Sequence, residues 1–286
     1  MTRAPVIGWT MLAGAALAAS AGSLPIQLGF AILAIGVLGM AHGASDLAIV
    51  APGRRPLFLF LYVSVSLICL AWWTGYPEIA LPLFLAASAI HFGVEDAPHG
   101  GLPERAARGI SLVATPAILH REGYGDILAF AAGHDISTTV LFLLIGGGAV
   151  ATALVLIMAI RRRDGRLLVG TGALLVLPPL IGFSIGFLVL HALPQTAQRR
   201  KEIGCVSHRA YFRAVGPVLL AALLIAAAVG AFFVDREGTG VRALFAGIAA
   251  LAMPHLLVTP WFEGRAGRPV AYSCPAISGR AQHPQT

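Results

Sequence analysis

The run STTVLFLLIGGGAVATALVLIMAI, residues 137–160, holds 24 residues without one charged side chain. A helix that crosses the hydrocarbon core of a bilayer needs about 20 mostly apolar residues, so this run predicts a transmembrane helix. Further runs that pass the same test are 6–22, 25–41, 56–75, 77–93, 167–191, 214–234 and 241–262. The sequence therefore predicts an all-α, polytopic integral membrane protein with about eight transmembrane helices.

The composition of the whole chain agrees with this class. Of 286 residues, 57% are apolar and 12% are charged, which is not the balance of a soluble domain. The net charge of +7 indicates basic loops that face anionic cytoplasmic lipid rather than nucleic acid. With the N-terminus inside, the first two arginine clusters (54–55 and 105–108) are cytoplasmic, as expected for a multi-pass protein of the inner (plasma) membrane. Residues 1–262 are predicted to form a single transmembrane domain, and the polar residues 263–286 a C-terminal tail.

One segment, 109–133, does not fit a simple span. It is apolar at both ends but carries Arg121, Glu122 and Asp126 in its middle, which is costly for a helix that faces lipid. We interpret it as a re-entrant or interfacial element. If it spans instead, residues 167–193 must double back at Pro178-Pro179. Both arrangements separate His91 and His191 by an even number of crossings and so place them on one side of the bilayer.

Four of the nine histidines lie in or at the end of apolar spans, where ionisable side chains are expensive and usually functional. They are His42, His91, His191 and His255. His120, in the irregular segment, is a weaker fifth candidate. The remaining histidines lie in loops or the tail, where we expect them to be solvated: His99, His134, His208 and His283.

Two of these histidines share a sequence pattern. Met40–Asp46 and Ile90–Asp96 each place an acid four residues after a histidine, so His42 would share a helix face with Asp46, and His91 with Glu95. A metal-bound imidazole normally donates its other N–H to a carboxylate. Asp46, with Glu95 or Asp96, is therefore predicted to orient the histidines rather than bind metal. Imidazole ligands without a Cys-x-x-Cys pair suit iron, copper or zinc, but not structural zinc.

The histidine motifs resemble those of the Brp/Blh family of bacterial and archaeal membrane β-carotene 15,15′-dioxygenases. The corresponding stretches are Ala41–Asp46, His91–Asp96, His191–Gln195 and Pro254–His255. Two positions depart from the family pattern: Ala41 replaces a proline, and Gln195 replaces a histidine. Because Pro194 disfavours helix, we expect the helix to end near Leu193. Gln195 would then lie beside the site as a hydrogen-bond donor to bound water, O₂ or a carboxylate, with His255 as the fourth ligand; the competing hypothesis is that the site has degenerated.

The resemblance implies an Fe²⁺ enzyme that uses O₂ to cleave β-carotene, or a related carotenoid, centrally to retinal. The metal ligands would be His42, His91, His191 and His255, and the bilayer would supply the water-insoluble substrate. A retinal-binding rhodopsin is a candidate acceptor of the product.

Other functions stay open at this point. Gly182–Gly186 matches Gly-x-Ser-x-Gly and would make Ser184 the nucleophile of an intramembrane hydrolase, although that motif belongs to a strand-to-helix turn in soluble enzymes. Small residues that pack one helix against another are its simpler explanation. A transporter with a His/acid proton relay, its helix broken at Pro178-Pro179, and a haem protein with two axial histidines are further alternatives.

Overall fold

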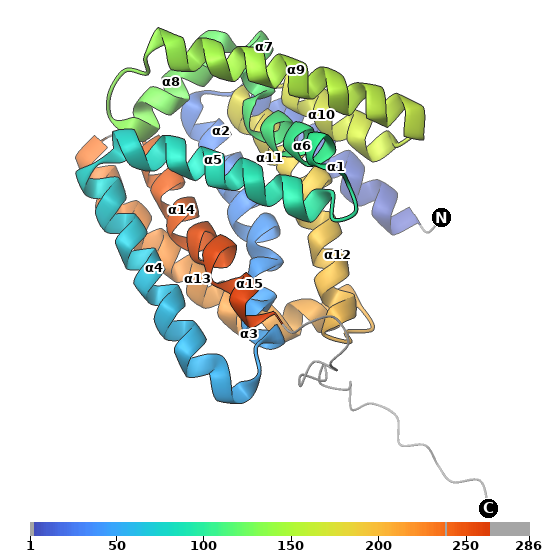
Figure 1. Cartoon of the computed structure of the whole chain (residues 1–286), viewed down its shortest axis with the longest axis vertical. Helices are drawn as coiled ribbons and strands as arrows, with labels where there is room; N and C mark the ends of the chain where they lie inside the picture. The colour runs from blue at the N-terminus through green and yellow to red at the C-terminus, as the bar shows by residue number, and fades with distance from the viewer. Residues whose placement is uncertain (1–2, 238, 264–286) are drawn as a thin grey trace, which may run out of the picture.

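The computed structural model describes residues 3–237 and 239–263, and every regular element within them is a helix (Figure 1). In chain order these are α1 (Arg3–Ser20), α2 (Leu24–Ala31), η1 (Ile32–Leu38), η2 (Gly39–Ala41), η3 (Gly43–Ser45), α3 (Asp46–Ile49), η4 (Pro52–Arg54), α4 (Arg55–Gly75), α5 (Pro77–Asp96), α6 (Leu102–Ala114), α7 (Pro116–Leu119), α8 (Arg121–Ala132), α9 (Thr138–Arg162), α10 (Gly165–Val176), α11 (Pro179–Phe187), η5 (Leu188–Ala192), α12 (Leu193–Glu202), α13 (His208–Glu237), α14 (Val241–Leu257) and α15 (Thr259–Phe262).

Seven helical runs of the described chain are long and apolar enough to cross a membrane. They are Leu24–Ile49, Pro52–Gly75, Pro77–Asp96, Thr138–Arg162, Pro179–Glu202, His208–Phe233 and Val241–Phe262. The expected span 6–22 is a shorter apolar helix, Ile7–Ser20. The predicted all-α polytopic membrane fold is confirmed. The expected tail lies, from residue 264 on, outside the described residues.

The first long run changes its helical period along its length. It is α-helical in α2, π-helical in η1, and 3₁₀-helical in η2 and η3 before α3 restores the α period. Gly36, Gly39 and Gly43 lower the α-helical propensity of this stretch. A side chain at Gly39 would collide with the ring of Phe187, so this run lies directly against α11. The expected span 25–41 therefore continues to residue 49, with irregular turns on both sides of His42.

A layer of closely packed helices holds α5 in place. A Cβ at Gly93 of α5 would meet the carbonyl of Arg105, and one at Gly109 of α6 the carbonyl of Ala89, so only glycine permits this approach. At the other side of α6, Arg162 of α9 donates to Glu104 Oε2 at 2.8 Å. Hydrogen bonding from Arg162, with Arg108 beside it, lowers the pKa of Glu104 to about 2.

The segment 109–133 is three helices rather than one. The first helix ends at Ala114 and Pro116 opens α7, with Thr115 between them still in the α-helical conformation. The backbone leaves the helical conformation at His120, before α8. Arg121, at the start of α8, stacks on Phe142 of α9 with its guanidinium 4.7 Å from the ring centre. Neither α7 nor α8 is long enough to cross a bilayer alone. The re-entrant or interfacial position of this segment stays a prediction.

The expected single span 167–191 is wrong. Helix α10 ends at Val176 and α11 begins at Pro179, because the two prolines at 178 and 179 cannot continue the hydrogen-bond ladder. The chain then doubles back: a Cβ at Gly170 would meet Leu190, and one at Gly186 would meet Leu174. The hairpin that the sequence offered as an alternative is therefore the observed arrangement, and the spanning run is Pro179–Glu202.

Candidate metal centre

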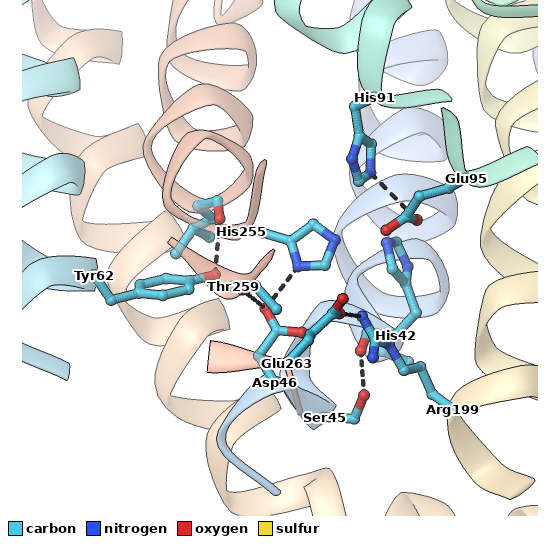
Figure 2. A network of polar contacts seen from close by, with 12 residues as sticks. His42, Ser45, Asp46, Tyr62, His91, Glu95, Arg199, His255, Thr259 and Glu263 are labelled. Atoms are coloured by element: carbon cyan, nitrogen blue, oxygen red, sulfur yellow. Dashed lines mark hydrogen bonds and ion pairs between the residues drawn. The ribbon is translucent and has the colours of Figure 1, made fainter. Parts of the chain in front are cut away.

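The four histidines in apolar surroundings come together from four different helical runs. His42 lies between η2 and η3, His91 on α5, His191 on η5 and His255 on α14. Their rings form a closed circuit, with centres 5.0 Å apart for His42–His191, 5.3 Å for His191–His91, 5.2 Å for His91–His255 and 5.3 Å for His255–His42. Figure 2 shows three of these rings, those of His42, His91 and His255, with the His91 ring above the Glu95 carboxylate and Asp46 below all three.

This spacing fits imidazoles that share one metal ion. A first-row metal lies about 2.1 Å from an imidazole nitrogen, which puts neighbouring ring centres about 4.7–5.4 Å apart for coordination angles of about 90–109°. All four observed separations fall within that range. His191 is fully buried, and the Nε2 atoms of His191 and His255 have no hydrogen-bond partner among the described residues. Buried nitrogens are rarely left unpaired without a functional reason, so the donor set fits a metal.

The opposite ring nitrogens are held by acceptors. His191 Nδ1 lies 3.0 Å from Asp96 Oδ1, and His255 Nδ1 lies 2.6 Å from Asp46 Oδ2. His42 Nδ1 lies 2.5 Å from the carbonyl of Gly39. An imidazole that donates from Nδ1 keeps its lone pair on Nε2, which is the tautomer that binds metal. The three acceptors thus favour nitrogen lone pairs directed into the centre.

The structure corrects the expected partner of Asp46. The i, i+4 spacing predicted that Asp46 faces His42, but its carboxylate bonds His255 and also accepts from Thr259 Oγ1 at 2.8 Å. The 3₁₀ geometry of η3, between His42 and Asp46, turns the carboxylate away from its own histidine. Asp46 therefore links the first spanning run to the last.

Glu95 lies on the other side of the rings from these acceptors. Its Oε2 atom is 3.5 Å from His91 Nε2 and 3.9 Å from His191 Nε2. Among the described residues, the candidate ligand atoms that all lie within 4.8 Å of one another are those of Glu95, His91 and His191, and this group does not include His42 or His255. The chain thus contains a His/Glu site able to hold a metal ion.

The expected helix end near Leu193 is wrong. The run from Pro179 continues to Glu202, because η5 is π-helical and the N–H of Leu193 bonds back to Leu188. This wider turn accommodates Pro194 at the start of α12 without ending the helix. Gln195 Nε2 donates to the backbone carbonyl of Glu95 at 3.2 Å. Gln195 is thus a hydrogen-bond donor beside the site, but its acceptor is the backbone at the end of α5 rather than the expected bound water, O₂ or carboxylate.

Sequence reasoning did not single out Thr259, Phe187 or Arg199. Thr259 lies four residues after His255 and Phe187 four before His191, so helical spacing could have suggested both. The Phe187 ring centre is 5.5 Å from that of His191. Arg199 is buried beside the network and pairs with Glu263 (Figure 2). It also pairs with Glu202. Nothing in the spacing of Arg199 indicates this position.

A cavity of about 500 Å³ adjoins the four histidines. Its walls come mainly from apolar side chains of α4, α5, α8, α11, α13 and α14. Three hydroxyl groups on the walls are bound to the backbone: Tyr62 donates to Leu251, Ser66 to Ala250 and Tyr124 to Val113. The cavity therefore presents an apolar surface and can hold a long apolar molecule beside a metal.

The other candidate residues lie outside this centre. Ser184 is fully buried, and its hydroxyl donates to the carbonyl of Leu180 at 2.6 Å. Gly182 and Gly186 lie against α10, so the Gly-x-Ser-x-Gly stretch serves helix packing. His120 lies at the bend before α8, with Nε2 3.1 Å from the carbonyl of Val176. This geometry does not support the hydrolase alternative.

Comparison with known proteins adds one family. Residues 33–263 match the family model described as Beta-carotene 15,15'-dioxygenase. The matched range contains all four histidines, the three acids beside them and the helices that line the cavity. No curated protein and no solved structure matches the chain.

Proposed function

The chain belongs to the beta-carotene 15,15'-dioxygenase family and is a carotenoid dioxygenase, and from this premise we propose an Fe(II) enzyme that uses O₂ to cleave the central double bond of β-carotene, or of a related carotenoid, to retinal. The family match confirms the resemblance seen in the histidine motifs. The observation that carries the finer proposal is the circuit of four imidazoles beside an apolar cavity.

In this proposal the metal ligands are His42, His91, His191 and His255. Bound Fe(II) would supply the activation of O₂ at coordination positions that the imidazoles leave open. Asp96, Asp46 and the Gly39 carbonyl hold the Nδ1 protons, which fixes the ring orientations. The transporter and haem alternatives are set aside, because the family match supports carotenoid cleavage.

The cavity is proposed to bind the polyene. A carotenoid dissolves in the bilayer, so its route to the site starts in lipid. Val63 of α4 and Ile225 of α13 both line the cavity, yet 54% and 52% of their surfaces are exposed on the outside of the protein. We place the substrate's access between these two helices. The apolar walls exclude water from the reacting bond. The proposed setting is the inner membrane, and a retinal-binding rhodopsin stays a predicted acceptor.

Expression in a β-carotene-producing bacterium tests the proposal. We expect loss of colour, accumulation of retinal and about one iron per purified chain. The matched variants are His255→Ala, which should leave carotene intact, and Ser184→Ala, which should still cleave it. Carotene that persists with iron-loaded wild-type protein would refute the proposal, and loss of cleavage in Ser184→Ala would show that the buried hydroxyl bonded to Leu180 is needed to keep the site in place.

Gln195→His tests whether the site has lapsed. Because His255 completes the circuit in place of a histidine at 195, we expect the wild type to be active without this substitution. If the wild type is inactive and Gln195→His cleaves carotene, the chain is a relative that has lost its activity.

A further inference from the structure

Three carboxylates surround the four imidazoles, and they face different nitrogens. Asp96 and Asp46 contact Nδ1 atoms, the positions from which a metal-bound imidazole donates its proton. The carboxylate of Glu95 lies instead beside the Nε2 atoms of His91 and His191. We propose that Glu95 is itself a ligand, which binds the metal through Oε2 next to the histidines. This inference rests on the proposed function.

The distances support direct binding. Two ligand atoms that share a metal at about 2.1 Å lie about 3.0–3.4 Å apart for angles of about 90–109°. Glu95 Oε2 is 3.5 Å from His91 Nε2 and 3.9 Å from His191 Nε2, so a shift of a few tenths of an ångström completes the geometry. No such shift could bring the Asp96 carboxylate to the metal. It contacts Nδ1 of His191, and the imidazole ring separates that atom from Nε2 of the same residue.

The local structure holds Glu95 in this position. Because α5 is a regular α-helix to Asp96, Glu95 follows His91 by one turn on the same face. Gln195 fixes the backbone at the same residue through the Glu95 carbonyl. The side chain, 25% exposed, keeps enough freedom to adjust toward an ion.

Charge also favours a carboxylate ligand. Four neutral imidazoles would leave the full charge of a divalent ion in surroundings that are largely apolar, which is costly. One bound carboxylate halves that charge. Asp46 and Asp96 do not neutralise the charge of the ion by direct binding, because each contacts the Nδ1 atom of a histidine ring.

Cobalt substitution of the full-length protein provides a test that does not depend on activity. The visible bands of Co(II) are weak at five coordination and strengthen at four, so Glu95→Gln should raise their intensity and lower Co(II) affinity. Asp96→Asn and Asp46→Asn are the matched controls. They should lower affinity by about 10 to 100-fold, as loss of an outer partner does, but leave the band pattern unchanged.

Infrared difference spectra of the Co(II)-loaded and metal-free protein give a second measurement. The wild type should show carboxylate bands that shift on metal binding and that disappear in Glu95→Gln. Unchanged cobalt and infrared spectra in Glu95→Gln would overturn the inference while leaving a four-histidine site intact. A wild-type chain that binds neither Fe(II) nor Co(II) would overturn the proposed function as well.

Discussion

The stretches 40–46 and 90–96 share a pattern, a histidine followed by an acid four residues later, yet they fold differently. In the second stretch Glu95 lies 3.5 Å from its own His91. In the first stretch Asp46 turns away from His42 and bonds His255, which is 209 residues later in the chain. Equal spacing in the sequence therefore does not give equal geometry at the site.

The helical period explains the difference. Four residues of α-helix advance about 40° past a full turn, so residues i and i+4 share a face. Four residues of 3₁₀-helix advance about 120° past it, which moves the acid to another face. Helix α5 keeps the α period, whereas the chain around His42 is 3₁₀-helical in η2 and η3. In both stretches an aspartate forms a hydrogen bond with a histidine of a different helical run: Asp46 with His255, and Asp96 with His191.

The largest effect is expected where the two stretches are equivalent. If both stretches supply a metal ligand, His42→Ala and His91→Ala should each lower carotenoid cleavage by more than about 100-fold. Loss of a residue that only hydrogen-bonds a ligand usually lowers activity by about 10 to 100-fold. The measurements are the iron content of the purified protein and the amount of retinal formed. His134→Ala is the control, because this exposed ring bonds the adjacent Asp135 carbonyl and lies outside the group of four histidines. Full iron in either ligand variant would break the equivalence.

The two aspartates should behave alike despite their different positions in the pattern. Asp46→Asn and Asp96→Asn should each weaken iron binding by about 10 to 100-fold. In ¹⁵N spectra of histidine-labelled protein, Asp46→Asn should move the His255 Nδ1 signal and Asp96→Asn that of His191. Movement of the His42 signal in Asp46→Asn, without that of His255, would contradict the crossed pairing.

The glycines of the two stretches should differ in stability. A Cβ at Gly93 would collide with the backbone of Arg105, whereas one at Gly43 would lie 3.8 Å from the His255 ring, an ordinary contact. Gly93→Ala should therefore lower the free energy of unfolding by about 1–3 kcal/mol, and Gly43→Ala by much less. Unfolding in detergent measures both. Equal losses would show that α6 can move away from α5.

The smallest effect is expected at Thr259, which supports only the first stretch. Its hydroxyl donates to Asp46 at 2.8 Å, so Thr259→Val should weaken iron binding by less than about 10-fold, below the loss of the carboxylate itself. Thr259→Ser keeps the hydroxyl and should bind iron as the wild type does. A loss as large as that of Asp46→Asn would make the threonine essential for holding the carboxylate.

Much of the fold could be predicted because lipid imposes a simple rule. A transmembrane helix needs about 20 apolar residues, so the length of a run such as 137–160 is enough to predict a span. The run 167–191 was wrongly predicted as one span, because its residues are apolar on both sides of the turn between α10 and α11. Prolines 178 and 179 were visible in the sequence, but only the packing of Gly170 and Gly186 against the opposite helix showed that the chain turns back there.

The sequence by itself determined the membrane class, the four histidines and the acids beside them, because charge and imidazole at membrane depth stand out against apolar runs. Only the tertiary structure decided which acid serves which histidine, since that depends on changes of helical period that composition does not encode. It also decided that Gln195 donates to the Glu95 carbonyl and that the Glu95 carboxylate lies beside the Nε2 atom of His191. The contacts of Gln195 with Glu95 and of Asp46 with His255 join residues 100 and 209 positions apart, and only packing of the helical runs brings them together.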